Sequence, residues 1–309
     1  MFGTFFRFEL WYWLRGFMLY VFVLINAVMA FSATYSDNVR IGGSLDNAHR
    51  NAPHVIQAFY AVMGLVCCLM TTAFVNSAAT RDFSCQTSGL IFCKPIGRLS
   101  YLLGRFFGSA LTASLPLLGV SLGIILAGWG PGNDPDRWGS ISWSAHVWGY
   151  LLFGLPNTLF LGALIFALAT LFRSTIVSFL AVILLLVGYS VSASLLTDLD
   201  NQQLAALLDP FGIRTFGVET RYWTVAEKNT QYLTLTGLML WNRLIWLGVG
   251  VADPGGILSA FFIFGASCAG IAGSGWANGC WSCGGAARGW CVSNGDRGDA
   301  EATAESGAD

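Results

Sequence analysis

The sequence is poor in charged residues. Of its 309 residues only 11% are Asp, Glu, Lys or Arg, whereas 55% are hydrophobic and the formal net charge is −1. An average soluble domain carries about 25% charged residues. The composition therefore excludes an ordinary soluble domain. We expect a polytopic membrane protein, with membrane lipid and no nucleic acid among its partners.

Two motifs for catalysis by the chain itself are absent. The only lysines are Lys94 and Lys228, and neither stands in the Gly-Lys-Ser/Thr context of a phosphate-binding loop. The histidines His49, His54 and His146 do not begin a His-Glu-x-x-His zinc motif. We therefore expect no ATP hydrolysis and no metallopeptidase activity, with no catalytic residue, cofactor or metal in the chain.

One pattern does match a catalytic template. The segment 119–123, Gly-Val-Ser-Leu-Gly, fits the G-x-S-x-G nucleophile elbow, which needs a sharp turn between a strand and a helix. Here the serine stands inside a long apolar block, where two glycines four residues apart are typical of close helix packing. We predict that Gly119 and Gly123 form a helix-packing face and that Ser121 is not a nucleophile.

We expect the other potential metal-ligand and disulfide residues to have no functional role. Asp46, His49 and His54 follow no metal-site spacing, and we expect them to be solvated loop residues. Cys67 and Cys68 stand inside an apolar block, so we expect thiols there and not a disulfide.

Long apolar blocks alternate with short polar connectors along the chain. A hydrocarbon core about 30 Å thick needs about 20 apolar residues in a helix. Lipid cannot satisfy an open sheet edge, so each block is predicted to be helical. We expect an all-α bundle of about six transmembrane helices. They are Phe17 to Ala33, Val55 to Val75, Phe106 to Leu126, Val147 to Phe172, Ile176 to Leu196, and one beginning near Leu244.

The connectors also predict an orientation. Alternate connectors contain Arg7, Arg15, Arg81, Lys94, Arg98, Arg105 and Arg173, and their only acids are Glu9 and Asp82. By the positive-inside tendency these connectors and the amino terminus face the cytoplasm. The aromatic stretch from Phe5 to Arg15 fits either an interfacial elbow helix on the inner leaflet or an aromatic belt at a helix end. On the opposite side, Asp200 begins a short helix with Leu204, Leu207 and Leu208 on one face.

The longest inner connector is the candidate partner site. The first five blocks have no Asp, Glu or Lys at mid-span, which argues against an ion-coupled carrier. Energy for transport would then come from a partner, and a short amphipathic helix in this connector suits docking to a soluble protein. An inner-surface loop held by anionic lipid is the alternative. The candidate residues are Arg81, Asp82, Phe83, Pro95, Arg98 and Arg105.

Several segments resemble a known family. They are Asn51-Ala52-Pro53, the stretch from Met70 to Ala79, the start Arg81-Asp82, the turn Pro95-Ile96-Gly97-Arg98, the stretch from Leu155 to Phe160, Arg173-Ser174-Thr175, the stretch from Leu208 to Gly212 and the stretch from Tyr222 to Glu227. Residues 1 to about 249 resemble an ABC-2 type transporter permease, most like the permease portion of bacterial fusions with an M1-family aminopeptidase. The connector departs from the ABC-2 pattern because it lacks the paired glutamates often found after its start.

The resemblance implies a function and partners. It implies the permease subunit of an ATP-binding cassette exporter in the bacterial inner membrane, acting as a homodimer or with a second permease. A separate P-loop ATPase subunit would contact the connector. The alternative is a membrane anchor for a peptidase domain lost by truncation, without transport, and a third reading is a non-functional fragment. The substrate does not follow from these residues.

The composition changes near residue 250. Residues 1–250 form the predicted permease domain, whereas 251–309 are rich in Gly, Ala and Cys. A codon choice exists for residues 251–261 in which the frame one nucleotide later encodes Leu-Leu-Thr-Leu-Ala-Ala-Ser-Tyr-Arg-Arg-Phe. That string completes an apolar helix and ends it in an Arg pair, as the positive-inside tendency favours. We therefore expect the tail to be out-of-frame translation and poorly ordered.

Overall fold

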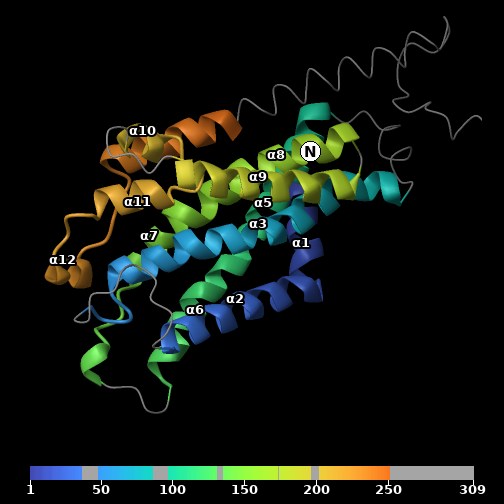
Figure 1. The fold of residues 1–309 in the computed structure, drawn as a ribbon. Helices are drawn as coiled ribbons and strands as arrows, with labels where there is room; N and C mark the ends of the chain where they lie inside the picture. The colour runs from blue at the N-terminus through green and yellow to red at the C-terminus, as the bar shows by residue number, and fades with distance from the viewer. Residues whose placement is uncertain (37–47, 86–96, 131–134, 173, 196–201, 251–309) are drawn as a thin grey trace, which may run out of the picture.

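The described part of the chain is a bundle of helices. The computed structural model describes residues 1–36, 48–85, 97–130, 135–172, 174–195 and 202–250, and these contain no strand (Figure 1). Among them, 4 helices are long and apolar enough to cross a membrane: Phe17–Tyr35, Pro53–Asp82, Leu99–Gly128 and Trp143–Phe172. A helical, membrane-embedded bundle is therefore confirmed. The predicted tail 251–309 lies outside the described residues.

The described residues of each predicted apolar block are helical, and two of the blocks are divided over several helical elements. The elements of the first half are α1 (Phe2–Leu14), α2 (Phe17–Tyr35), α3 (Pro53–Ser84), α5 (Arg98–Ser114), η1 (Leu115–Leu117), α6 (Leu118–Gly128) and η2 (Pro135–Arg137). They are followed by α7 (Trp143–Gly149), η3 (Tyr150–Gly154), α8 (Leu155–Phe172), α9 (Thr175–Leu195), α10 (Gln202–Leu207), α11 (Ile213–Glu219) and α12 (Val225–Thr230). Residues 237–250 are also helical, so this last helix begins before Leu244. Helix α9 is an apolar helix of 21 residues.

Proline breaks two of the long spans. Pro116 lies in the 3-10 turn η1 between α5 and α6, and Pro156 follows the π-helical turn η3. Proline has no backbone N–H and its ring crowds the carbonyl four residues earlier, so the regular helical ladder cannot continue through it. The Thr158 hydroxyl donates to the Gly154 carbonyl at 2.9 Å and thereby satisfies an acceptor beside the break.

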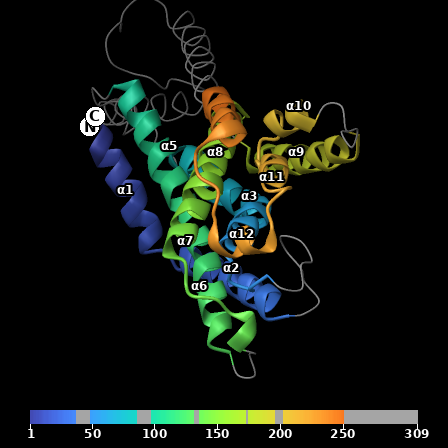
Figure 2. The same ribbon diagram turned by 90° about the vertical axis from the view of Figure 1, so that its left-hand side faces the viewer.

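Glycine lets α2 and α6 touch. A Cβ added at Gly119 would lie 2.3 Å from the Val23 carbonyl oxygen, and one at Gly123 would lie 2.3 Å from the Ala27 carbonyl oxygen. The prediction that these glycines form a helix-packing face is therefore confirmed. Helix α3 lies within the bundle, in contact with α5, α7, α8 and α9, and Figure 2 shows α3 and α8 between α5 and α9.

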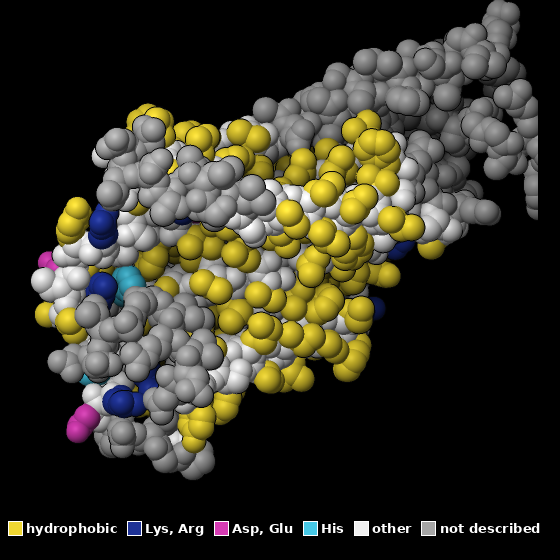
Figure 3. All heavy atoms as spheres, viewed as in Figure 1, with side chains coloured by type: hydrophobic (Ala, Val, Ile, Leu, Met, Phe, Trp, Pro, Cys, Tyr) yellow, Lys and Arg dark blue, Asp and Glu magenta, His cyan; other side chains and the backbone are white. Residues whose placement is uncertain are grey.

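Apolar side chains cover the outside of the bundle as well as its core. Figure 3 shows them across the middle of the molecule, with charged side chains mostly towards the end that carries α11 and α12. On α2, Phe17, Leu24 and Val28 are exposed, and on α9 so are Ile176 and Leu184. Such surfaces suit lipid contact.

The amino-terminal end of α3 is covered by the segment that contains α11 and α12. Both the amide nitrogen and the carbonyl oxygen of Leu233 bond the buried Gln57 side chain, at 2.8 and 2.7 Å. His54 is buried against Phe216 and Trp223, so the expectation of a solvated loop residue was wrong for it. The cause is this covering segment, which lies far away in the sequence.

The predicted short helix is present as α10, but with an unexpected orientation. Ala205 and Ala206 are buried, whereas Leu204 and Leu208 are exposed. The Ala206 carbonyl accepts hydrogen bonds from Thr215 and Asn242, which holds the alanine side of the helix against the bundle. Asp200 lies outside the described residues.

Candidate functional site

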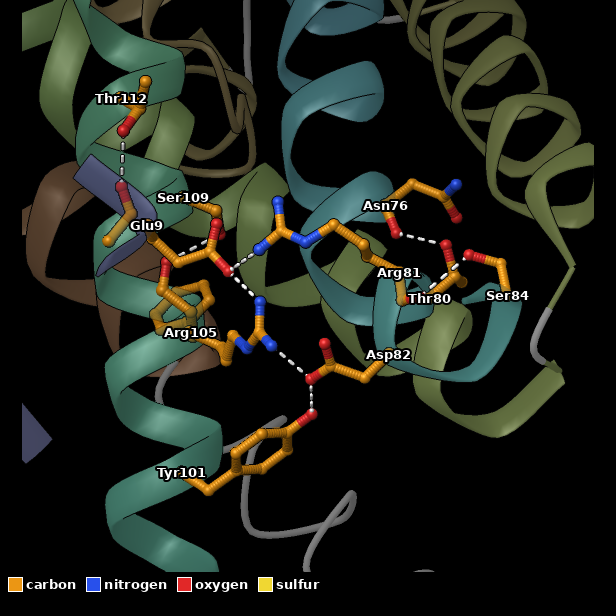
Figure 4. Close-up of polar contacts among 12 residues, drawn as sticks. Glu9, Asn76, Thr80, Arg81, Asp82, Ser84, Tyr101, Arg105, Ser109 and Thr112 are labelled. Atoms are coloured by element: carbon orange, nitrogen blue, oxygen red, sulfur yellow. Dashed lines mark hydrogen bonds and ion pairs between the residues drawn. The ribbon is translucent and has the colours of Figure 1, made fainter. Parts of the chain in front are cut away.

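A buried cluster of charged side chains joins three helices at the carboxyl end of α3. Glu9 of α1 forms ion pairs with Arg81 of α3 and Arg105 of α5, and Arg105 also pairs with Asp82 of α3 (Figure 4). The Tyr101 hydroxyl of α5 donates to Asp82 Oδ2 at 2.6 Å. Arg81 and Asp82 stand near the start of the longest inner connector and Arg105 near its end, so the structure brings these predicted residues together.

The cluster contains equal numbers of positive and negative groups and is almost fully buried. The Glu9 side chain is 0% exposed, and that of Arg105 is 3% exposed. Two guanidinium groups face two carboxylates, and an opposite charge at hydrogen-bond distance offsets part of the cost of burial. Burial raises the pKa of Glu9, against the lowering effect of the Arg105 and Arg81 charges. Loss of any one partner would therefore leave an uncompensated buried charge.

Aromatic rings enclose the two guanidinium groups. The Arg81 guanidinium carbon lies 4.0 Å from the centroid of the Tyr12 ring, and that of Arg105 lies 5.4 Å from the centroid of the Phe8 ring. Both rings belong to α1. Contacts of this kind attract a cation to the ring face and exclude water from it. The predicted elbow helix is thus a helix, and its aromatic residues hold the cluster as well as facing outward.

Two glycines of α5 bring α1 close enough for these contacts. A Cβ added at Gly104 would lie 2.7 Å from Phe5 Cβ, and one at Gly108 would lie 2.6 Å from Glu9 Cβ. Such distances require the helix backbones to move apart. Gly108 therefore fixes how deep the Glu9 carboxylate reaches between α3 and α5.

The remaining predicted connector residues are only partly placed. Phe83 lies in the last turn of α3 and Arg98 is the first residue of α5, whereas Pro95 lies outside the described residues.

Sequence reasoning missed the roles of Glu9 and Tyr101. A signal was present for Glu9, since it and Asp82 are the only acids of the arginine-rich connectors. The few carboxylates in an arginine-rich region are expected to form ion pairs with those arginines.

A second buried arginine lies at the other side of α8. Arg243 is 2% exposed and donates from Nη1 to Asn157 Oδ1 at 2.7 Å and from Nη2 to the Phe211 carbonyl at 2.8 Å. Gly212 has a φ of 74°, and a Cβ there would lie 1.6 Å from Arg243 Nη2. Within the described residues no carboxylate forms an ion pair with this guanidinium. Amide and backbone oxygens thus hold the cation.

Comparisons with known proteins leave the family open. No family model matches the chain, and no curated protein matches it in sequence. Within the described residues, no group of three or more His, Cys, Asp or Glu side chains is placed to hold a metal ion.

Proposed function

We propose that this chain is the transmembrane subunit of an ABC-2 type exporter, driven by a separate P-loop ATPase. It would lie in the bacterial inner membrane with six spans and a cytoplasmic amino terminus, as a homodimer or with a second permease. The support is the resemblance of its sequence motifs to such permeases, together with the apolar helical bundle.

The ion cluster is the observation that carries the proposal. Arg81 and Asp82 lie near the start of the longest inner connector and Arg105 near its end, and Glu9 links both to α1. A push on the connector by a partner would therefore move α1, α3 and α5 together. A loop that only rested on lipid would need no such link, because anionic lipid attracts basic residues without fixing the helices behind them.

The test uses the P-loop ATPase encoded nearest to this gene. We expect the purified chain to bind that ATPase and to change its rate of ATP hydrolysis in proteoliposomes. Arg98→Glu, at the first residue of α5, should weaken binding by about tenfold or more, since like-charge contacts at an interface cost several kcal/mol. Arg137→Glu, an exposed change in η2, is the matched control and should bind as the wild type does.

Two results would overturn the proposal. The first is a folded Arg98→Glu variant that binds the ATPase as tightly as the wild type does. The second is an ATPase whose hydrolysis rate is the same with and without the chain. With no ATPase gene nearby and no ATPase bound, a membrane anchor without transport would account for the chain better.

A further inference from the structure

Three helices form a line of hydrogen bonds that ends at a cavity. The Tyr60 hydroxyl of α3 lies 2.7 Å from Ser121 Oγ of α6, and Ser121 Oγ lies 2.8 Å from His146 Nδ1 of α7. The cavity is partly open to the outside and measures about 160 Å³, and His146 is part of its wall. None of these residues belongs to the ion cluster or to the connector.

The direction of the protons along this line follows from Tyr60. Its side chain is 0% exposed, and among the described residues its hydroxyl bonds only Ser121. If His146 Nδ1 carried the ring proton, Ser121 would accept it. Either the Ser121 proton or the Tyr60 proton would then have no acceptor along the line, which is penalised in the interior.

The opposite direction pairs the protons of Tyr60 and Ser121 and leaves only the ring N–H of His146 without a partner. Tyr60 donates to Ser121, Ser121 donates to His146 Nδ1, and the ring proton of neutral His146 then lies on Nε2. No described hydrogen bond involves Nε2, and His146 is 5% exposed while lining the cavity. The buried side chain therefore presents an N–H donor to the cavity.

The rest of the cavity wall defines what such a donor would meet. Ile56, Ile124, Trp129 and Trp138 supply apolar and aromatic surface, and no Lys, Arg, Asp or Glu among the described residues lines it. The Asn51 side chain, also in the wall, is occupied by the backbone of Gly139 at 2.7 Å in both directions. An apolar cavity of about 150 Å³ holds a benzene-sized molecule.

We propose that this cavity binds a neutral, ring-sized apolar molecule with one acceptor oxygen, and that His146 Nε2–H donates to that oxygen. The site lies where α6 ends and α7 begins, whereas the ion cluster lies at the carboxyl end of α3. Binding here does not depend on the exporter proposal.

Two probes of matched shape test the site. Acetophenone has an acceptor oxygen and ethylbenzene has none. Binding of each to the purified full-length chain in detergent is measured by ligand-observed NMR in wild type and in His146→Phe. The ratio of the two affinities in wild type is divided by the same ratio in the variant, so that partition into detergent cancels. With each ratio written as the affinity for acetophenone over that for ethylbenzene, we expect the quotient to be about three to ten, which corresponds to one hydrogen bond.

Val147→Ala is the matched control, since Val147 is exposed on the same helix and is not among the described residues that line the cavity. It should keep the wild-type ratio. A quotient near one, or no saturable binding of either probe, would overturn the proposal.

A second measurement does not depend on how the variant folds. In wild-type protein with ¹⁵N-labelled histidine, the His146 ring should carry its proton on Nε2, and acetophenone but not ethylbenzene should shift that resonance. A proton on Nδ1, or an Nε2 resonance that acetophenone leaves unchanged, would contradict the proposal.

Discussion

The two buried arginines, Arg105 and Arg243, are held in opposite ways. Arg105 pairs with the carboxylates of Glu9 and Asp82, whereas Arg243 is bonded by an amide oxygen and backbone carbonyls. The first arrangement joins three helices by opposite charges on side chains. The second joins the helix 237–250 to α8 through the neutral Asn157 side chain and to the turn at Phe211 through a backbone carbonyl. Opposite charges therefore control the first site, whereas neutral oxygens and the backbone of the turn control the second.

The largest effect should come from unbalancing the ionic site. Glu9→Ala leaves Arg81 and Arg105 with a single carboxylate in a buried place, and removing one partner of a buried pair costs about 3–5 kcal/mol. Unfolding in detergent with a chemical denaturant measures this loss. Asp136→Ala, at an exposed acid of η2, should change stability by less than about 0.5 kcal/mol. Equal losses in the two variants would mean that the cluster adds nothing.

The backbone-held site should break at Gly212. Gly212→Ala places a methyl group on the Arg243 guanidinium and forces a side chain onto a residue with a φ of 74°. Backbone strain together with lost hydrogen bonds should cost about 3 kcal/mol in the same unfolding assay. Gly217→Ala in α11 has open space around it and should be neutral or slightly stabilising. If both variants unfold alike, Arg243 is not held by this turn.

A smaller effect should follow from moving the helix that carries Glu9. Gly108→Ala adds a methyl group 2.6 Å from Glu9 Cβ and should cost about 2 kcal/mol, as overpacking usually does. Gly3→Ala on α1 meets nothing within 4 Å and serves as the control. In the double variant Gly108→Ala with Glu9→Ala, the two losses should not add fully, because the ion cluster that the Gly108 methyl group disturbs is already broken by loss of the Glu9 carboxylate. Simple addition would separate the helix packing from the ion cluster.

The smallest effect concerns a carboxylate in water. Glu227 accepts hydrogen bonds from the Thr224 backbone and hydroxyl, and these lower its pKa. Because the pKa of Glu227 is lowered in the folded state, its carboxylate stabilises α12 at pH values above 4.5, the ordinary pKa of this group. This stabilisation is lost as the pH falls through the pKa of the folded state. Cα chemical shifts of α12 should therefore move towards coil values in acid. Glu227→Gln should remove that pH dependence, and a wild-type helix unchanged at low pH would argue against the capping role.

The sequence predicts the helices well and the polar contacts poorly. The apolar blocks and the Gly119 and Gly123 face follow from local pattern, because length and spacing along one helix determine them. The inward position of Glu9 depends on which helix packs beside α1. The only sequence signal for this position is the small number of acidic residues in the arginine-rich connectors. Ser121 resembled a nucleophile by motif, yet its bond to His146 arises because α6 and α7 both pack against α3. Contacts between distant segments require the fold itself.

The most direct test of the central claim is a double-mutant cycle between Glu9 and Arg105. Unfolding free energies of wild type, Glu9→Gln, Arg105→Gln and the double variant are measured in one detergent. If α1 is linked to the end of the connector through this pair, the double variant should be less destabilised than the sum of the single variants by about 1.5 kcal/mol or more. Additivity within about 0.5 kcal/mol would contradict the link.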